Sequence, residues 1–175
     1  MRIQYVLLVI FLTFLVGCES QDYNAEQDVF QTKEAAIKHF LDEFPRSDIE
    51  HVKTTDDDEL FIVRSGNHQY DVYGMENEHN RYSIVKLTAT LSLHNTIAGS
   101  AEFHTPMGND YTYLVVKQNN HDKLPHDTRT KFEMSPILSG DAELSLNQGH
   151  IGVKSQSIMP TNVIKSTETI VSQGI

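Results

Sequence analysis

The chain has 175 residues and carries 24 acidic side chains against 14 basic ones, for a formal net charge of −10 at pH 7. This length suffices for one domain with a hydrophobic core, whereas two full domains take roughly 100–150 residues each. The negative charge excludes the basic surface with which proteins bind nucleic acid, and it opposes adsorption of the domain to an anionic membrane.

The first 17 residues have the composition of an export signal. Arg2 is followed by an apolar run over residues 5–17, in which Thr13 is the one polar interruption, and the chain turns polar directly after Cys18. A membrane-spanning helix needs roughly 20 apolar residues, so this run is too short to cross a bilayer and is typical of a signal peptide. We therefore predict that residues 1–17 are removed, which leaves 158 residues with a net charge of −11.

Leu15, Val16, Gly17 and Cys18 stand at the junction between the apolar run and the polar segment. They resemble the lipobox of bacterial prolipoproteins, in which the cysteine thiol receives a diacylglycerol and a peptidase cleaves before the cysteine. The resemblance covers only the signal region. It implies that Cys18 is lipidated, that Leu15, Val16 and Gly17 are recognition positions, and that the protein is anchored on the extracytoplasmic face of the cell membrane. An ordinary signal peptide or an uncleaved anchor with an incidental cysteine is the alternative.

Cysteine usage fits an attachment point. Cys18 is the only cysteine of the chain, so the exported domain cannot form an internal disulfide. A single cysteine at the acylation position is better explained by lipidation than by redox or metal chemistry.

The first predicted element of the domain is a helix over residues 32–44. Its apolar side chains recur with helical spacing at Ala36, Ile37, Phe40, Leu41 and Phe44. The Thr32 hydroxyl can cap the first turn, and Pro45 disfavours helical backbone at the residue before it. Asp42 and Glu43 oppose the helix dipole, so we expect the helix to depend on packing of its apolar face.

The middle of the chain predicts antiparallel strands. Residues 83–93 alternate, with Val85, Leu87, Ala89, Leu91 and Leu93 on one side and polar residues on the other. Such alternation is typical of a strand with one buried and one solvated face. Two predicted hairpins pair residues 60–63 with 69–73 and residues 101–105 with 111–117 around turn-forming residues, and residues 74–81 predict a polar loop.

These elements predict an α+β domain, with an N-terminal amphipathic helix packed on an antiparallel β-sheet of about five strands. The domain covers residues 32–165. Before it, residues 18–31 form a polar tether with a span of roughly 20 Å. Residues 149–157 can add a further strand through Ile151 and Val153, and residues 166–175, rich in Ser and Thr, predict a frayed polar tail.

Two groups of side chains are candidate metal ligands. His94 and His104, with Glu102, flank a turn region around Gly99 and can approach each other if their strands pair. The acidic run at 56–59 lacks the spacing and the glycine of a calcium loop, so it predicts a solvated hairpin tip. We favour surface histidines over a metal site, and therefore predict no metal and no cofactor.

No catalytic residue is predicted either. The chain has no Gly-x-Ser-x-Gly turn and no glycine-rich phosphate loop, and its single thiol is expected to be acylated. Glu76 and Glu78 lie in the predicted polar loop, where we expect neither burial nor a neighbouring charge to make them catalytic. Five tyrosines lie on or beside the strands, at positions 70, 73, 82, 111 and 113; they can form an interface, but we favour packing at the edge of the core.

The layout is similar to that of small, uncharacterised lipoproteins of Gram-positive bacteria: a lipobox, a polar tether, an early amphipathic helix and a meander of strands. We expect a membrane-anchored binding module that contacts an envelope protein through a sheet face. The alternative is a metal- or carboxylate-assisted cell-envelope hydrolase, which requires His94, Glu102 and His104 to converge in a pocket. A third interpretation, capture of a small apolar ligand between helix and sheet, requires a cavity of roughly 300 Å³ or more.

Overall fold

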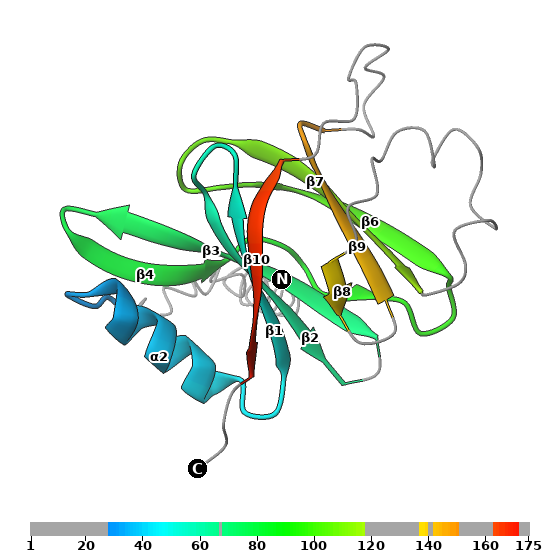
Figure 1. The fold of residues 1–175 in the computed structure, drawn as a ribbon, viewed down its shortest axis with the longest axis horizontal. Coiled ribbons are helices and arrows are strands. Elements are labelled where there is room, and N and C mark those ends of the chain that lie inside the picture. The colour runs from blue at the N-terminus through cyan, green and yellow to red at the C-terminus, as the bar shows by residue number, and fades with distance from the viewer. Residues whose placement is uncertain (1–27, 67, 118–136, 140–141, 151–162, 172–175) are drawn as a thin grey trace, which may run out of the picture.

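The structure is a computed structural model that describes residues 28–66, 68–117, 137–139, 142–150 and 163–171 (Figure 1). The predicted signal peptide, Cys18, most of the tether and the predicted strand through Ile151 and Val153 lie outside the described residues. Within the described part, no helix combines the length and the apolar composition needed to cross a membrane.

The predicted helix is confirmed as α2, Lys33–Glu43. The Thr32 side chain accepts a hydrogen bond from the backbone N–H of Ala35 at 3.2 Å, as expected of an N-cap. Phe44 leaves the helical conformation just before Pro45. The Phe40 ring is buried and packs on aromatic rings of the adjacent sheet, with its centroid 5.3 Å from that of Phe61.

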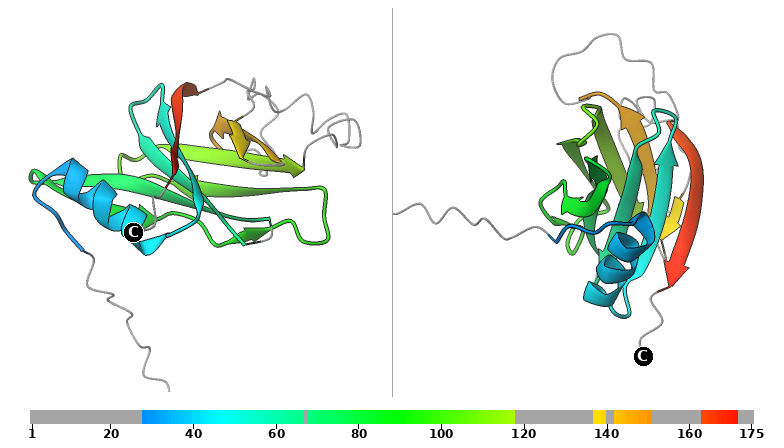
Figure 2. Two further views of the ribbon diagram at one scale, coloured as in Figure 1. Left: turned by 60° about the horizontal axis from the view of Figure 1, so that its bottom comes forward. Right: turned by 90° about the vertical axis from the view of Figure 1, so that its left-hand side faces the viewer.

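The described residues form two antiparallel sheets, one of six strands and one of four. Figures 1 and 2 show how these sheets are arranged. The first sheet has the order β10 (Ile164–Val171), β1 (Asp48–Thr54), β2 (Glu59–Ser65), β3 (Gln69–Glu78) and β4 (Arg81–Lys86), with β5 (Leu91–Ser92) also paired to β3. The second sheet has the order β6 (Ala98–His104), β7 (Asp110–Lys117), β9 (Ala142–Gln148) and β8 (Ile137–Ser139). The expected α+β class is confirmed, whereas the second sheet was not predicted.

The core has two parts, one on each face of the first sheet. Between the sheets, buried side chains of β1, β2 and β3 meet those of β6, β7 and β9, including Leu60, Val72, Tyr113 and Leu144. On the opposite face, Phe40 of α2 joins Ile49, Phe61 and Val63. The molecule is therefore layered as helix, sheet and sheet, and both faces of the first sheet contribute to the core.

The predicted long strand over residues 83–93 is wrong in its middle. It consists of β4 and β5, both paired to β3, with an interruption between them. Thr88, expected on the solvated side, is buried, and Ala89, expected to be buried, is exposed. The cause is a contact with the neighbouring strand: the Thr88 hydroxyl accepts a hydrogen bond from the backbone N–H of Val72 at 3.1 Å, in place of a ladder carbonyl.

The predicted loop over residues 74–81 is also wrong. Strand β3 continues to Glu78 and pairs with β4 up to the Glu78–Arg81 register. Only His79 and Asn80 form the turn, with φ of 53° and 61°. Positive φ at both central residues is the conformation of a type I′ hairpin turn. The outer end of this hairpin is exposed, so its polar composition is compatible with strands.

The predicted polar tail is a strand as far as Val171. Strand β10 pairs with β1 from the Ile164–Thr54 to the Val171–Asp48 register. An edge strand is held by backbone hydrogen bonds and can keep exposed polar side chains, as residues 165–169 do. The domain therefore extends beyond the predicted boundary at residue 165.

Candidate functional site

A groove of about 530 Å³ opens where four parts of the chain meet. It lies between the start of α2, the β1–β2 turn, the β3–β4 hairpin and the β6–β7 turn, and we call it the acidic groove. It is lined by Lys33, Asp57, Glu59, Met75, Glu76, Asn77, Glu78, Tyr82, Pro106 and Met107. Its volume falls within the range of small-molecule and peptide-side-chain pockets, roughly 300–1,000 Å³.

Carboxylates dominate the charge of the acidic groove. Four acidic side chains line it against one lysine. Lys33 forms an ion pair with Glu59, and His51 Nε2 lies 3.2 Å from the second Glu59 oxygen. Burial alone would raise the pKa of Glu59, but hydrogen bonds and charges from Lys33 and His51 lower it below its usual value. Glu59 is therefore ionised at neutral pH.

The remaining carboxylates of the groove are accessible. Asp57 pairs with Lys165 at 2.8 Å, and this hydrogen bond lowers the pKa of the Asp57 carboxyl. The Ser83 hydroxyl donates to Glu76 at 3.2 Å, and Glu78 lies 3.7 Å from His79 Nδ1. The lowered pKa values of Asp57 and Glu59 keep both carboxyls ionised at neutral pH. This favours binding of positive charge over general acid catalysis, which needs a carboxyl with a raised pKa.

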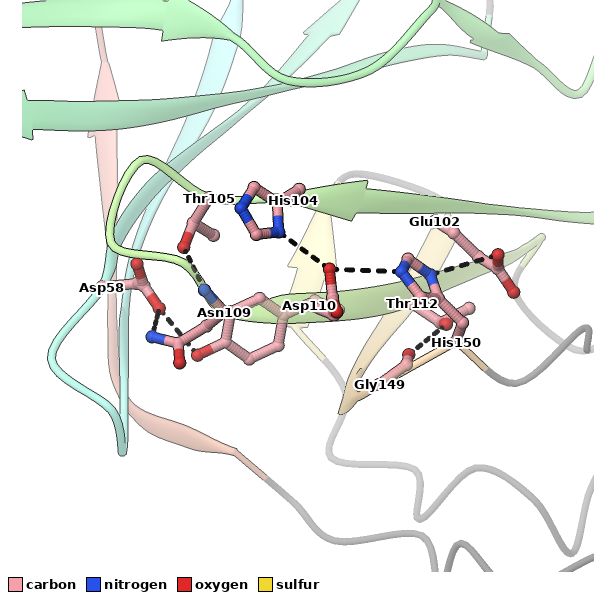
Figure 3. Close-up of polar contacts among 10 residues, drawn as sticks. Asp58, Glu102, His104, Thr105, Asn109, Asp110, Thr112, Gly149 and His150 are labelled. Carbon is pink, nitrogen blue, oxygen red and sulfur yellow. Dashed lines mark hydrogen bonds and ion pairs between the residues drawn. The ribbon is translucent and has the colours of Figure 1, made fainter. Parts of the chain in front are cut away.

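A buried polar network holds two walls of the groove together (Figure 3). The Tyr111 hydroxyl of β7 donates to Asp58 at 2.8 Å and lies 3.0 Å from an oxygen of Asp56. The Asn109 amide also donates to Asp58 at 2.8 Å. Burial, with the neighbouring carboxylates, raises the pKa of Tyr111 far above its usual value, so its hydroxyl remains a donor. The network thus fixes the β1–β2 turn against the β6–β7 turn.

This network corrects the expectation that the whole 56–59 run is a solvated tip. Asp57 is exposed as expected, but Asp58 is only 2% exposed. The burial of Asp58 is possible because Tyr111 and Asn109 satisfy its oxygen. Its burial leaves Asp57 and Glu59, on either side, to line the groove.

A chain of alternating carboxylates and imidazoles lies beside the network (Figure 3). Asp110 Oδ1 is 2.9 Å from His104 Nδ1 and 3.2 Å from His150 Nε2. The other ring nitrogen of His150 lies 3.1 Å from Glu102 Oε2. Because His150 uses opposite ring nitrogens, the four side chains form a row and do not converge on one point. The hydrogen bond from His104 lowers the pKa of Asp110.

The predicted trio of His94, Glu102 and His104 is not assembled. Glu102 and His104 are on β6 and belong to the same row, but His94 precedes the other end of this strand. Its carbonyl accepts from Lys117 Nζ at the end of β7, at 3.4 Å. The six residue steps from Ala98 to His104 span roughly 20 Å. The hydrolase interpretation thus lacks the convergence that it requires.

Among the described residues, the cavity under α2 is small, and both faces of the first sheet are used by the core. The cavity between α2 and β4, which is lined by Phe40 and Ile84, measures about 180 Å³, below the 300 Å³ set for an apolar ligand. The hydrophobic core uses both faces of the first sheet. Tyr70, Tyr111 and Tyr113 are fully buried, so these three tyrosines are not exposed for an interface.

Sequence reasoning missed the acidic groove as a site. In the sequence, its four carboxylates stand out only as parts of an acidic run (Asp57 and Glu59) and of a predicted polar loop (Glu76 and Glu78). Tyr82 stands out only as one of five tyrosines near the strands, and Lys33 and Met107 give no signal in the sequence, because their proximity depends on how the hairpins pack. No protein-family model, no curated protein sequence and no solved structure matches the chain.

Proposed function

We propose that the protein is a lipid-anchored, extracytoplasmic binding module whose acidic groove takes a Lys- or Arg-bearing segment of an envelope protein. The observation that carries this proposal is the groove of about 530 Å³ lined by four carboxylates from two hairpins, β1–β2 and β3–β4. Complementary charge speeds encounter and selects the partner, so an acidic groove favours a cationic occupant.

The groove also offers apolar contacts. Met75, Tyr82, Pro106 and Met107 line it together with the carboxylates. Met107 is 60% exposed, at the tip of the β6–β7 turn. Methionine and tyrosine are well suited to interfaces, where their flexible or flat side chains adapt to a partner. The proposed partner segment therefore carries an apolar residue next to its basic one.

Anchoring follows from the lipobox resemblance at Cys18. A diacylglycerol supplies two acyl chains, which is what stable membrane attachment requires. Because the domain is negatively charged, it is repelled from an anionic surface, and the lipid is its membrane contact. Replacing Cys18 by Ala is expected to move the chain from the membrane fraction to the soluble fraction. Retention of the variant in the membrane fraction would contradict the lipid anchor.

The groove is tested by titrating the purified full chain with an octalysine peptide by calorimetry. Exposed ion pairs are worth roughly 0.2–1 kcal/mol each, so Glu76→Gln with Glu78→Gln should weaken binding about 2- to 30-fold. The control, Asp42→Asn with Asp48→Asn, removes the same charge at the end of α2 and at the start of β1, away from the groove. Equal weakening by both pairs would show a net-charge effect and refute the groove as the site.

A further inference from the structure

We propose that Asp28, His39 and Glu43 form a binding site for a divalent transition-metal ion. This site shares no residue with the acidic groove and does not depend on the function proposed for it. Each residue offers one ligand atom, and these atoms all lie within 4.8 Å of one another. The shortest approaches use different nitrogens of the ring, with His39 Nε2 3.4 Å from Asp28 Oδ2 and His39 Nδ1 4.0 Å from Glu43 Oε1. An ion takes only one of these nitrogens, and one atom of each of the three residues still lies within 4.8 Å of the other two. We call these three residues the Asp28 cluster.

The donor set selects the class of ion. An imidazole suits zinc and other transition metals, whereas calcium and magnesium take oxygen ligands only. Zinc bonds of 2.0–2.1 Å in a tetrahedron place ligand atoms about 3.3 Å apart, so the donors need to approach by at most about 1.5 Å. The side chains of His39, Asp28 and Glu43 are 40%, 64% and 56% exposed. Rotamer changes can therefore close the site without disturbing the core.

The charge at the end of α2 independently favours a cation there. The last turn of the helix contains Asp42 and Glu43 and no basic residue. The C-terminal end of a helix carries roughly half a negative charge, so both carboxylates are unfavourably placed. Asp28 adds a third carboxylate beside them. A bound dication offsets this accumulation of negative charge.

The surrounding residues fix the backbone that carries the donors. Phe30 exchanges two backbone hydrogen bonds with Tyr82, both of 2.8 Å, which fixes the segment carrying Asp28 against β4. The Phe30 ring lies 5.0 Å from the His39 ring. Beside the donors is the cavity of about 180 Å³, which leaves room for water as a further ligand. His39 and Glu43 are one helical turn apart, so both face this cavity.

Metal binding would join the segment before the domain to the helix. Asp28 precedes α2, while His39 and Glu43 lie in its second half. An ion held by all three therefore fixes the point at which the chain enters the domain. The metal-bound form should resist unfolding more strongly than the apo form, because the ion binds only the folded arrangement.

The test is a calorimetric titration of the chelator-treated full chain with zinc chloride at pH 7.5. We expect one saturable site, at least tenfold weaker in His39→Ala and in Asp28→Asn, and unchanged in His94→Ala and in His104→Ala. Zinc should also raise the Tm of the wild type and leave that of His39→Ala unchanged. Circular dichroism confirms that each variant is folded; Asp28→Asn keeps the shape of an exposed side chain and preserves the test if His39→Ala unfolds. No saturable binding, or equal binding by wild type and Asp28→Asn, would overturn the proposal.

Discussion

Removing one hydroxyl from the buried network is the most direct probe of how the groove is built. In Tyr111→Phe the ring is retained, and the hydrogen bonds that connect β7 to the β1–β2 turn are lost. The hydroxyl donates to Asp58, a carboxylate that is 2% exposed and whose other described donor is Asn109. A hydrogen bond to a charged group contributes roughly 1.5–3 kcal/mol, so we expect the free energy of unfolding to fall by about 2 kcal/mol.

Urea denaturation followed by far-UV circular dichroism measures this loss, since the chain has no tryptophan for fluorescence. For a domain of this size, 2 kcal/mol lowers the Tm by about 4–8 °C. Tyr82→Phe is the matched control, because it removes a hydroxyl from a partly exposed ring and should change stability by less than about 0.5 kcal/mol. A Tyr111→Phe variant as stable as this control would refute the inference that the network supports the groove.

Three further outcomes follow from individual contacts. Thr88→Val leaves the backbone N–H of Val72 without its acceptor and should cost about 1–3 kcal/mol in urea denaturation, whereas Thr88→Ser keeps the hydroxyl and should cost less. Burial lowers the pKa of His51 in the folded protein below its unfolded value of about 6.5. The unfolded chain therefore takes up a proton first as the pH falls, so the free energy of unfolding is highest above pH 6.5 and declines below it. His51→Gln should flatten this decline between pH 7.5 and 5.5, and an unchanged slope would contradict the inference. At Gly99 a Cβ would lie 2.9 Å from methyl carbons of Leu91 and Leu93, so Gly99→Ala should destabilise the fold by about 1–3 kcal/mol, and a neutral result in urea would show that both leucines can move.

The elements that sequence alone predicted are those whose signals are local. The helix follows from the Thr32 cap, the spacing of its apolar residues and Pro45, and the turn at residues 106–110 follows from its Pro, Gly and Asn. In contrast, β10 is an edge strand held by its backbone, so its polar side chains do not distinguish it from a loop. Alternation along a strand also does not indicate which of two sheets it joins, and the second sheet was missed for that reason.

The candidate site could not be predicted because its contacts are long-range. Asp58 is buried through Tyr111 and Asn109, which lie more than 50 residues later in the chain. Thr88 breaks the alternation by bonding to the backbone of Val72 on a neighbouring strand. The acidic groove itself needs four segments to meet. The spacing of residues along the chain does not show which of them come into contact in these ways.

The central claim, that the acidic groove engages a partner at the cell envelope, is most directly tested by crosslinking on intact cells that express the full chain. A photo-reactive amino acid replaces the exposed Met107 at the groove, and the crosslinked products are compared with and without Glu76→Gln and Glu78→Gln. The account predicts a specific envelope-protein adduct that the two groove substitutions reduce, that Cys18→Ala abolishes, and that Asp42→Asn with Asp48→Asn leaves intact. An adduct whose yield does not change when Glu76 and Glu78 are replaced, or the absence of a specific adduct from the wild type, would contradict this account.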